Sequence, residues 1–322
     1  MTRNCKRLGS GILAILLIQS IAPMGSARAA ATGRDLGLMS IEELLEIEVT
    51  SVSKRPQKVS EAPAAITVLT GEDIRRSGVT SVPEALRMVP GIHVAQIDGN
   101  KWAITSRGFN DQFANKLLVL IDGRSVYTPL FSGVFWDIQD VMLEDVDRIE
   151  VVRGPGGTLW GANAVNGVIN IITKSAAETQ GSLVSIGSGS VERYFTQARI
   201  GGKLGENTHY RVYAKYFTRE DLADEPGGAA NDDWSMTRGG FRMDWDAHTG
   251  DSLTFQGDYY GGDENEVLKG PTGPVPGGEK VSGGNLLTRW DHEFEDGSAA
   301  HLQVYYDRVQ RKVDSIIRAD RD

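Results

Sequence analysis

The stretch "RGPGGTLWGANAVNG", residues 153–167, decides whether the first half of the chain is a nucleotide-binding fold. Five of its fifteen residues are glycine, and it lies between two strand-like runs, "DRIEVV" and "VINIIT". A phosphate-binding P-loop needs a Lys followed by Ser or Thr and then a helix, and a dinucleotide-binding loop also opens a helix. Neither pattern is present here. The glycines are therefore predicted to serve a tight, packed turn, because glycine permits positive φ angles and close backbone approach.

Residues 61–175, which surround this stretch, read as a mixed α and β domain. Thr70 is predicted to cap a short helix over "GEDIRRSG" that ends at Gly78. Ser81 and Glu84 have the capping-box spacing for a second helix over "VPEALRMV". The β-branched content of six further runs predicts strands, namely "AAITVLT", "IHVAQI", "WAITSRG", "LLVLIDG", "RIEVVRG" and "VINIITK".

From about residue 180 onward, apolar and polar side chains alternate along each run. In "YRVYAKYF" one face carries Tyr210, Val212, Ala214 and Tyr216, and the other carries Arg211, Tyr213 and Lys215. Similar runs lie at residues 241–246, 253–259, 286–294 and 301–306. Runs of this length cross a bilayer as tilted strands, with one lipid-compatible face and one face toward a polar lumen. The alternative is a soluble β-domain, which would carry fewer charges opposite its buried face.

The connections between these runs alternate between short and long, as in outer-membrane barrels. "GKLGEN", "DAHTG" and "FEDGS" are short turns, whereas residues 219–233 and 261–284 are predicted to be long, polar, flexible loops. About seven strands are expected between residues 181 and 310, and seven antiparallel strands cannot close a bacterial barrel. Residues 181–322 are therefore expected to be the N-terminal part of a transmembrane barrel in a longer protein.

The first 29 residues are predicted to be a secretory signal peptide. Arg3, Lys6 and Arg7 precede the apolar run "ILAILLI", and residues 27–29, "ARA", form a small-x-small cleavage site. The alternative is a membrane anchor. The single cysteine, Cys5, would leave with this peptide, so the mature chain is expected to have no disulfide and no thiolate metal site. Residues 30–60 are expected to be a loosely ordered periplasmic segment with a short amphipathic helix around residues 41–45.

Charge and composition exclude several classes of protein. The formal net charge of −9 argues against a broad nucleic-acid-binding surface. No later run is apolar enough for a transmembrane helix, so a membrane role would have to come from strands. The histidines are scattered without metal-ligand spacing, at His93, His209, His248, His292 and His301. We find no catalytic arrangement, and we expect no enzyme activity, no cofactor and no metal site.

Four segments resemble, in order, the plug domain of TonB-dependent outer-membrane receptors. They are residues 61–92, "TSRGF" at 105–109, "LLVLIDGRSVY" at 117–127 and residues 147–174. The resemblance is dense from residue 47 to about 175 and weaker over the later strands. It implies an α+β plug domain followed by a transmembrane antiparallel β-barrel of about 22 strands, whose lumen the plug fills. Only about seven of those strands are expected in this sequence.

The same resemblance implies a TonB box just before the plug. The candidate residues are Ile47, Glu48, Val49, Thr50, Ser51 and Val52. Ser51 departs from the commonest pattern, which has alanine there. A box of this kind needs an extended, unpaired strand edge to which TonB can add a strand. The alternative is an ordinary β-prone linker.

The resemblance further implies active uptake across the outer membrane of a Gram-negative bacterium. TonB and its inner-membrane energising complex would be the partners, and the receptor would sit among outer-membrane lipids as a monomer. A ferric siderophore is the expected ligand. The alternatives are cobalamin or another organic nutrient, or a different class of protein, a passive porin or adhesin. A porin has no separate N-terminal domain, so residues 61–175 argue against it.

Two segments of the plug are expected to reach the ligand, "RGFNDQFANK" and "GRSVYTPLFSGVFW". Arginine suits an anionic chelate, and aromatic side chains suit an organic scaffold. The candidate ligand-binding residues are Arg107, Phe109, Asn110, Arg124, Tyr127, Phe131 and Trp136. The alternative for all of them is contact between plug and barrel, in which Arg107 and Arg124 would neutralise luminal carboxylates.

Overall fold

The computed structural model describes residues 48–51, 57–62, 64–161, 163–223, 229–248, 250–270 and 273–313. The predicted signal peptide, the helix expected around residues 41–45, and Ile47 and Val52 of the candidate TonB box lie outside these ranges. In the part of the chain that is described, no helix is long and apolar enough to cross a membrane.

A five-stranded mixed sheet organises the N-terminal half. Its strands lie in the order β3 (Ala65–Thr70), β8 (Val146–Arg153), β9 (Gly167–Thr173), β6 (Leu117–Ile121) and β7 (Arg124–Ser125). β6 and β9 are parallel, and the other neighbours are antiparallel. Two smaller antiparallel pairs complete this half, β4 (Ile92–Gln96) with β5 (Trp102–Ser106) and β1 (Glu48–Val49) with β2 (Gln57–Lys58). All six strands predicted in the plug are therefore confirmed, whereas β1, β2 and β7 were not foreseen.

Two predicted helices form with the expected caps. Helix α2 (Gly71–Ser77) begins at Thr70, whose hydroxyl accepts from the Asp73 amide at 3.2 Å while the Asp73 carboxylate accepts from the Thr70 amide at 2.9 Å. It ends at Gly78, whose φ is +73°. Helix α3 (Val82–Leu86) begins at Ser81, whose hydroxyl accepts from the Glu84 amide at 3.5 Å, but the helix ends three residues earlier than predicted. Among the described residues, short 3-10 helices lie at Val59–Glu61, Leu143–Asp145 and Ala177–Thr179.

The glycine-rich stretch is a packed turn between β8 and β9, as its sequence predicts. Gly154 and Gly161 have φ angles of +137° and +90°. A Cβ at Gly167 would lie 2.4 Å from the Val152 carbonyl oxygen, so only glycine lets the two strands pair there. A short helix, α4 (Gly157–Trp160), occupies the middle of the turn and was not foreseen.

The core of this half lies on the central strands. Every residue of β6 is buried, and Ile149, Val151, Ile169 and Ile171 on β8 and β9 are completely buried. Helices α2 and α3 add Ile74 and Leu86, among others, to the same cluster. Continuous burial along β6 and β9 follows from a parallel pair that is covered on both faces.

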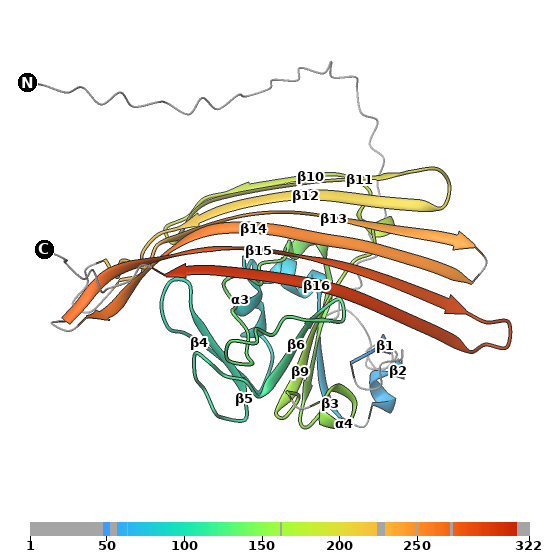
Figure 1. The fold of residues 1–322 in the computed structure, drawn as a ribbon, viewed down its shortest axis with the longest axis horizontal. Coiled ribbons are helices and arrows are strands. Elements are labelled where there is room, and N and C mark those ends of the chain that lie inside the picture. Colours follow the sequence, from blue (N-terminus) through green and yellow to red (C-terminus); the bar gives the residue numbers. More distant parts are fainter. Residues whose placement is uncertain are drawn as a thin grey trace, which may run out of the picture. The chain divides into compact units, whose positions relative to one another are not determined.

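The C-terminal half is one seven-stranded antiparallel sheet in which the strands follow chain order (Figure 1). They are β10 (Gly181–Gly187), β11 (Glu192–Lys203), β12 (Thr208–Arg219), β13 (Trp234–His248), β14 (Asp251–Gly270), β15 (Gly273–Glu293) and β16 (Ala299–Val313). The prediction of seven strands is confirmed. Because β10 pairs only with β11 and β16 only with β15 among the described residues, the sheet is open.

Side chains on the two faces of this sheet differ in the predicted way. Val212 is 54% exposed and Leu302 is 57% exposed, whereas Arg211 and Lys215 are buried against the plug. A soluble sheet would bury its apolar face instead. An exposed apolar face with a charged face turned inward is typical of a transmembrane barrel wall.

The prediction that residues 261–284 form a flexible loop is wrong. β14 and β15 continue through this segment, and their pairing runs without a break from Asp251↔His292 to Gly270↔Gly273. The backbone ladder needs no apolar side chains, and cross-strand polar pairs such as Lys280–Asp263 at 2.6 Å supply contacts between the strands. Apolar–polar alternation is missing from this segment, so the sequence pattern could not reveal it.

Candidate functional site

The "RGF" segment of the plug has an unusual backbone. Arg107, Gly108 and Phe109 follow one another with φ angles of +61°, +93° and +59°. A left-handed conformation costs a non-glycine residue about 1–3 kcal/mol, and such strain tends to gather at functional sites. The conformation turns the chain sharply where β5 ends. It leaves Phe109 75% exposed, and Arg107 and Asn110 are exposed beside it.

The polar side chains of this segment form few hydrogen bonds, and those are long. The Arg107 guanidinium donates to the Arg153 carbonyl oxygen at 3.5 Å, a long contact, and not to a carboxylate. Asn110 Oδ1 accepts from the Thr105 hydroxyl at 3.3 Å. Among the described residues, Arg107 forms no ion pair and Asn110 forms only this hydrogen bond, so both side chains can turn toward a bound ligand.

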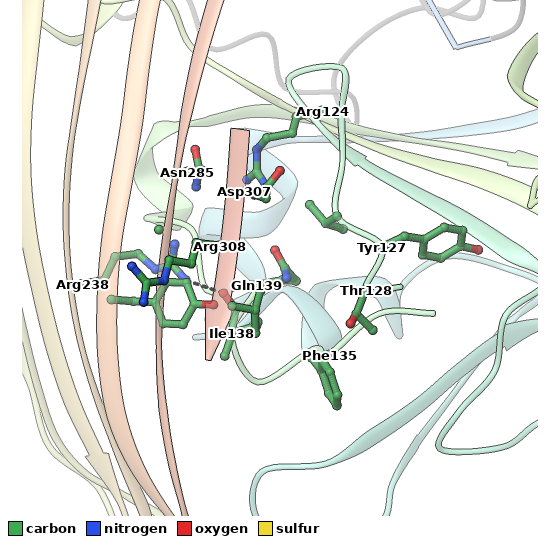
Figure 2. Close-up of a pocket in the computed structure, with 14 residues that line it drawn as sticks. Arg124, Tyr127, Thr128, Phe135, Ile138, Gln139, Arg238, Asn285, Asp307 and Arg308 are labelled. Carbon is green, nitrogen blue, oxygen red and sulfur yellow. Dashed lines mark hydrogen bonds and ion pairs between the residues drawn. The ribbon is translucent and has the colours of Figure 1, made fainter. Parts of the chain in front are cut away.

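The second predicted segment lies against the seven-stranded sheet. Arg124 is buried, and its guanidinium makes an ion pair with Asp307 on β16 at 2.5 Å (Figure 2). This contact with a carboxylate of the seven-stranded sheet is the kind that the alternative reading of Arg124 expects. The Tyr127 hydroxyl donates to the Leu117 carbonyl oxygen at 2.8 Å, and burial raises the pKa of Tyr127 to about 12.

Two aromatic side chains of the same segment pack against other residues of the plug and do not project into solvent. The Phe131 ring meets the rings of Phe113 and Phe135 edge to face, with centroids 5.0 Å apart in each case. Trp136 is buried in the hydrophobic core. The seven predicted ligand residues therefore form two groups. Arg107, Phe109 and Asn110 are exposed together, whereas Arg124, Tyr127, Phe131 and Trp136 belong to the plug interior or its contact with the wall.

Polar contacts join the turn after β6 to the seven-stranded sheet, here called the wall. The Asp122 carboxylate accepts from the Thr173 amide at 2.8 Å and from Gln256 on β14 at 2.9 Å. Arg289 on β15 donates to the Asp122 carbonyl oxygen at 2.5 Å. Arg211 on β12 reaches the Thr173 hydroxyl at 3.1 Å. The side chains that the sequence assigned to the polar face of the strands thus bind plug backbone and carboxylates.

A second polar contact centres on Arg311 of β16. Its guanidinium bonds Asp137 of the plug, lies 3.3 Å from Glu264 on β14 and 3.0 Å from Glu279 on β15, and stacks 4.0 Å from the Phe135 ring centroid. The three carboxylates are buried. Sequence reasoning missed this cluster, because its members come from four separate segments and Arg311 lies near the end of the last strand.

The turn between β4 and β5 contacts the β12–β13 connection, the longest one in the seven-stranded sheet. The Gly99 amide donates to Asp232 at 2.6 Å, and Lys101 lies 2.8 Å from the Glu266 carboxylate. Asp232 also accepts from the Leu222 amide at 2.8 Å, within the β12–β13 connection. A Cβ at Gly99 would lie 2.3 Å from the Asp232 carbonyl oxygen, so this close approach requires glycine.

The described part of the candidate TonB box is held by the plug. Glu48 and Val49 pair with Lys58 and Gln57 along one edge. The Thr50 and Ser51 amides then donate to the Glu150 carboxylate at 3.0 Å and 2.8 Å.

Further contacts fix Ser51 in the same place. Its hydroxyl donates to Glu150 at 2.5 Å, and the Trp160 indole N–H donates to its carbonyl oxygen at 2.7 Å. Glu150 is completely buried, and its other oxygen accepts from Arg148 at 2.8 Å. A buried carboxylate is therefore satisfied partly by this N-terminal segment.

Within the described residues, no group of three or more His, Cys, Asp or Glu side chains is arranged to hold a metal ion. The candidate site thus consists of three parts of the plug: the strained RGF turn, the contacts with the strands, and the docked segment around Ser51.

Comparison with known proteins identifies the N-terminal half. Residues 58–168 match the TonB-dependent receptor plug domain. The vitamin B12 transporter BtuB of Vibrio cholerae is 32% identical over 199 residues, which cover 62% of this chain and 32% of that protein. The BtuB of Vibrio vulnificus is 35% identical over 144 residues, 44% of this chain and 23% of that protein. The chain thus spans about a third of the length of the curated relatives it matches.

Solved structures share the fold at lower identity. The ferripyoverdine receptor of Pseudomonas aeruginosa is 20% identical with a TM-score of 0.64, covering 81% of this chain and 36% of that one. The copper transporter OprC is 18% identical with a TM-score of 0.64, covering 78% of this chain and 38% of that one. Residues 58–168 thus carry the plug domain of TonB-dependent receptors, and the relatives and the shared architecture of plug and antiparallel strands support the same family for the chain.

Proposed function

We propose that this protein is an outer-membrane receptor of a Gram-negative bacterium that takes up a ferric siderophore or a similar metal chelate with energy delivered by TonB. Residues 1–29 would be its cleaved signal peptide, residues 30–60 the periplasmic segment with the TonB box, residues 61–175 the plug, and residues 181–322 the first part of the barrel. The receptor would act as a monomer among outer-membrane lipids.

One observation carries the proposal: the plug is bound to the charged face of strands whose other face is apolar and exposed. Arg289 binds Asp122, and Arg211 binds Thr173, across this contact. Such a plug fills the lumen, so a solute can cross only when the plug moves. The outer membrane holds no ATP, and the energy for that movement must arrive through a periplasmic partner. A passive porin, the alternative class, would have an open lumen.

The partner would act through residues 47–52. TonB would add a strand to this segment, and main-chain hydrogen bonds would give the contact its strength. The Glu48–Val49 strand already pairs with β2 along one edge, and Ser51 is bound to Glu150. Access to the whole segment therefore requires its release from the plug.

Ligand contact is assigned most readily to Arg107, Phe109 and Asn110. These three residues are exposed, and the strained turn sets the backbone from which their side chains can reach a ligand. An arginine offers paired donors to an anionic chelate, and a phenylalanine offers a flat apolar surface to its organic part. Tyr127 and Phe131 would contribute indirectly by shaping the segment behind them.

Cobalamin is a second candidate cargo. It is favoured by the 32% identity to a protein named as a vitamin B12 transporter, whereas the siderophore receptors among the solved structures are only about 20% identical. Both cargoes are large metal chelates, so the proposed transport mechanism is the same for either.

Competition binding would separate the two cargoes. The receptor, purified from outer membranes in detergent, would be incubated with radiolabelled cyanocobalamin or with ferric hydroxamate and ferric catecholate siderophores. Saturable binding of a ferric siderophore that excess cyanocobalamin does not displace would support the first candidate. Saturable cyanocobalamin binding alone would select the second, and no saturable binding of any probe would contradict the proposed chelate class.

A further inference from the structure

A small cavity lies between the plug segment 124–139 and strands β13–β16 (Figure 2). Its volume is about 40 Å³, room for roughly one to three groups the size of water. A metal chelate is far larger than this, so the cavity is not a binding site for the whole cargo.

Three hydrogen-bond donors on the side chains that line the cavity have no partner among the described residues. They are Arg124 Nε, Arg238 Nε and the Tyr260 hydroxyl. All three side chains are more than nine-tenths buried. Buried donors are nearly always satisfied, because an unpaired one costs about 1–3 kcal/mol. An acceptor that fits the cavity would satisfy them.

The charges around the cavity favour an anion as that acceptor. Arg124 is balanced by Asp307 at 2.5 Å. Arg238 makes no close ion pair: its nearest carboxylate is Asp258 at 3.9 Å, it donates to the Ile138 carbonyl oxygen, and its guanidinium lies 4.8 Å from the Tyr260 ring centroid. Arg308 also lines the cavity and forms no ion pair with another described residue. Arginine side chains donate and cannot accept hydrogen bonds, so the lining is rich in donors and positive in net charge.

We propose that this cavity binds one small monovalent anion, of the size of chloride, between plug and barrel wall. The ion would accept from Arg238 and Tyr260 and would offset the charge of Arg308. Because Arg124 comes from the plug and Arg238 and Tyr260 come from β13 and β14, the ion would stabilise the contact between the two. Arg124 and Tyr127, two of the predicted ligand residues, line the cavity, whereas the exposed residues Arg107, Phe109 and Asn110 do not.

Bromide provides a direct probe, because its anomalous scattering locates it in a crystal. The receptor purified from outer membranes would be crystallised with sodium bromide. We expect an anomalous peak in the cavity within hydrogen-bonding distance of Arg238 and Tyr260. Water density without an anomalous peak at this position would overturn the proposal.

A solution titration provides the second test. Bromide should raise the thermal unfolding midpoint of the receptor above that in sodium gluconate of equal ionic strength, since gluconate is too large for the cavity. Tyr260→Phe removes one donor and should require roughly tenfold more bromide for the same rise. Arg193→Gln, at an exposed arginine on β11 away from the cavity, should respond like the unsubstituted protein. An equal response from Tyr260→Phe would contradict the site.

Discussion

Ser51 and Glu150, separated by 99 residues in the chain, are joined by a 2.5 Å hydrogen bond from the Ser51 hydroxyl and a 2.8 Å bond from its amide. Glu150 lies on β8, between β3 and β9 in the plug sheet, and is completely buried. The segment proposed to contact TonB is thus tied to the plug sheet, which is proposed to move. A pull on the first would act directly on the second.

Substitution of Ser51 by alanine should loosen this connection. A hydrogen bond to a charged group contributes about 1.5–3 kcal/mol, so undocking of residues 48–51 should become about tenfold more frequent or more. Hydrogen exchange of the Thr50 and Ser51 amides would measure it. Ser188→Ala, at an exposed serine in the β10–β11 turn, is the matched control. Unchanged exchange in Ser51→Ala would mean that the amide bonds alone hold the segment.

Deletion of residues 47–52 should separate binding from transport. We expect the deletion variant to bind its chelate as the unsubstituted receptor does, because the RGF turn and the wall contacts remain. Energised uptake should be abolished, because TonB has no strand to pair with. Equal loss of binding and uptake would show that the segment supports the plug rather than TonB.

The glycine-rich turn allows a test of close packing with a control in the same stretch. Gly167→Ala would place a Cβ 2.4 Å from the Val152 carbonyl oxygen and should disturb the β8–β9 pairing, at a cost of about 1–3 kcal/mol. Gly157→Ala meets only the Ala164 carbonyl oxygen at 4.0 Å, at the first position of α4, and should be neutral or stabilising. Thermal unfolding in detergent would compare them. Similar midpoints for both variants would contradict the packing argument.

Tyr127 should make stability depend on pH at the alkaline end. Burial raises its pKa from 10.0 to about 12, so the folded state favours the neutral phenol. The resulting stabilisation is present below pH 10 and is lost as the pH rises from 10 to 12. Thermal unfolding across this range should show a smaller alkaline loss of stability in Tyr127→Phe. Tyr306→Phe, at an exposed tyrosine, should retain the full loss. Identical profiles for all three proteins would refute the role of Tyr127.

Local patterns in the sequence predicted local structure well. Thr70 and Gly78 bound α2 because a capping side chain and a left-handed glycine act on their immediate neighbours. Alternation from Tyr210 to Tyr216 predicted the faces of β12 because a strand repeats every two residues. The same rule failed at residues 261–284, where apolar and polar residues do not alternate although the strand pairing continues.

Contacts between distant segments could not be predicted in the same way. The sequence offered two roles for Arg124, and only the position of Asp307 on β16 decides that it pairs with the wall. Nothing near Ser51 indicates Glu150 as its partner. The positive φ angles of Arg107 and Phe109 are equally hidden, because both residue types normally avoid that conformation.

We propose that the plug opens only when TonB acts on it. The most direct test is accumulation of a radiolabelled chelate, ferric siderophore or cyanocobalamin, by cells that produce this receptor with and without TonB. We expect saturable binding in both strains and accumulation only where TonB is present. Equal accumulation in cells that lack TonB would contradict it and would indicate a passive channel.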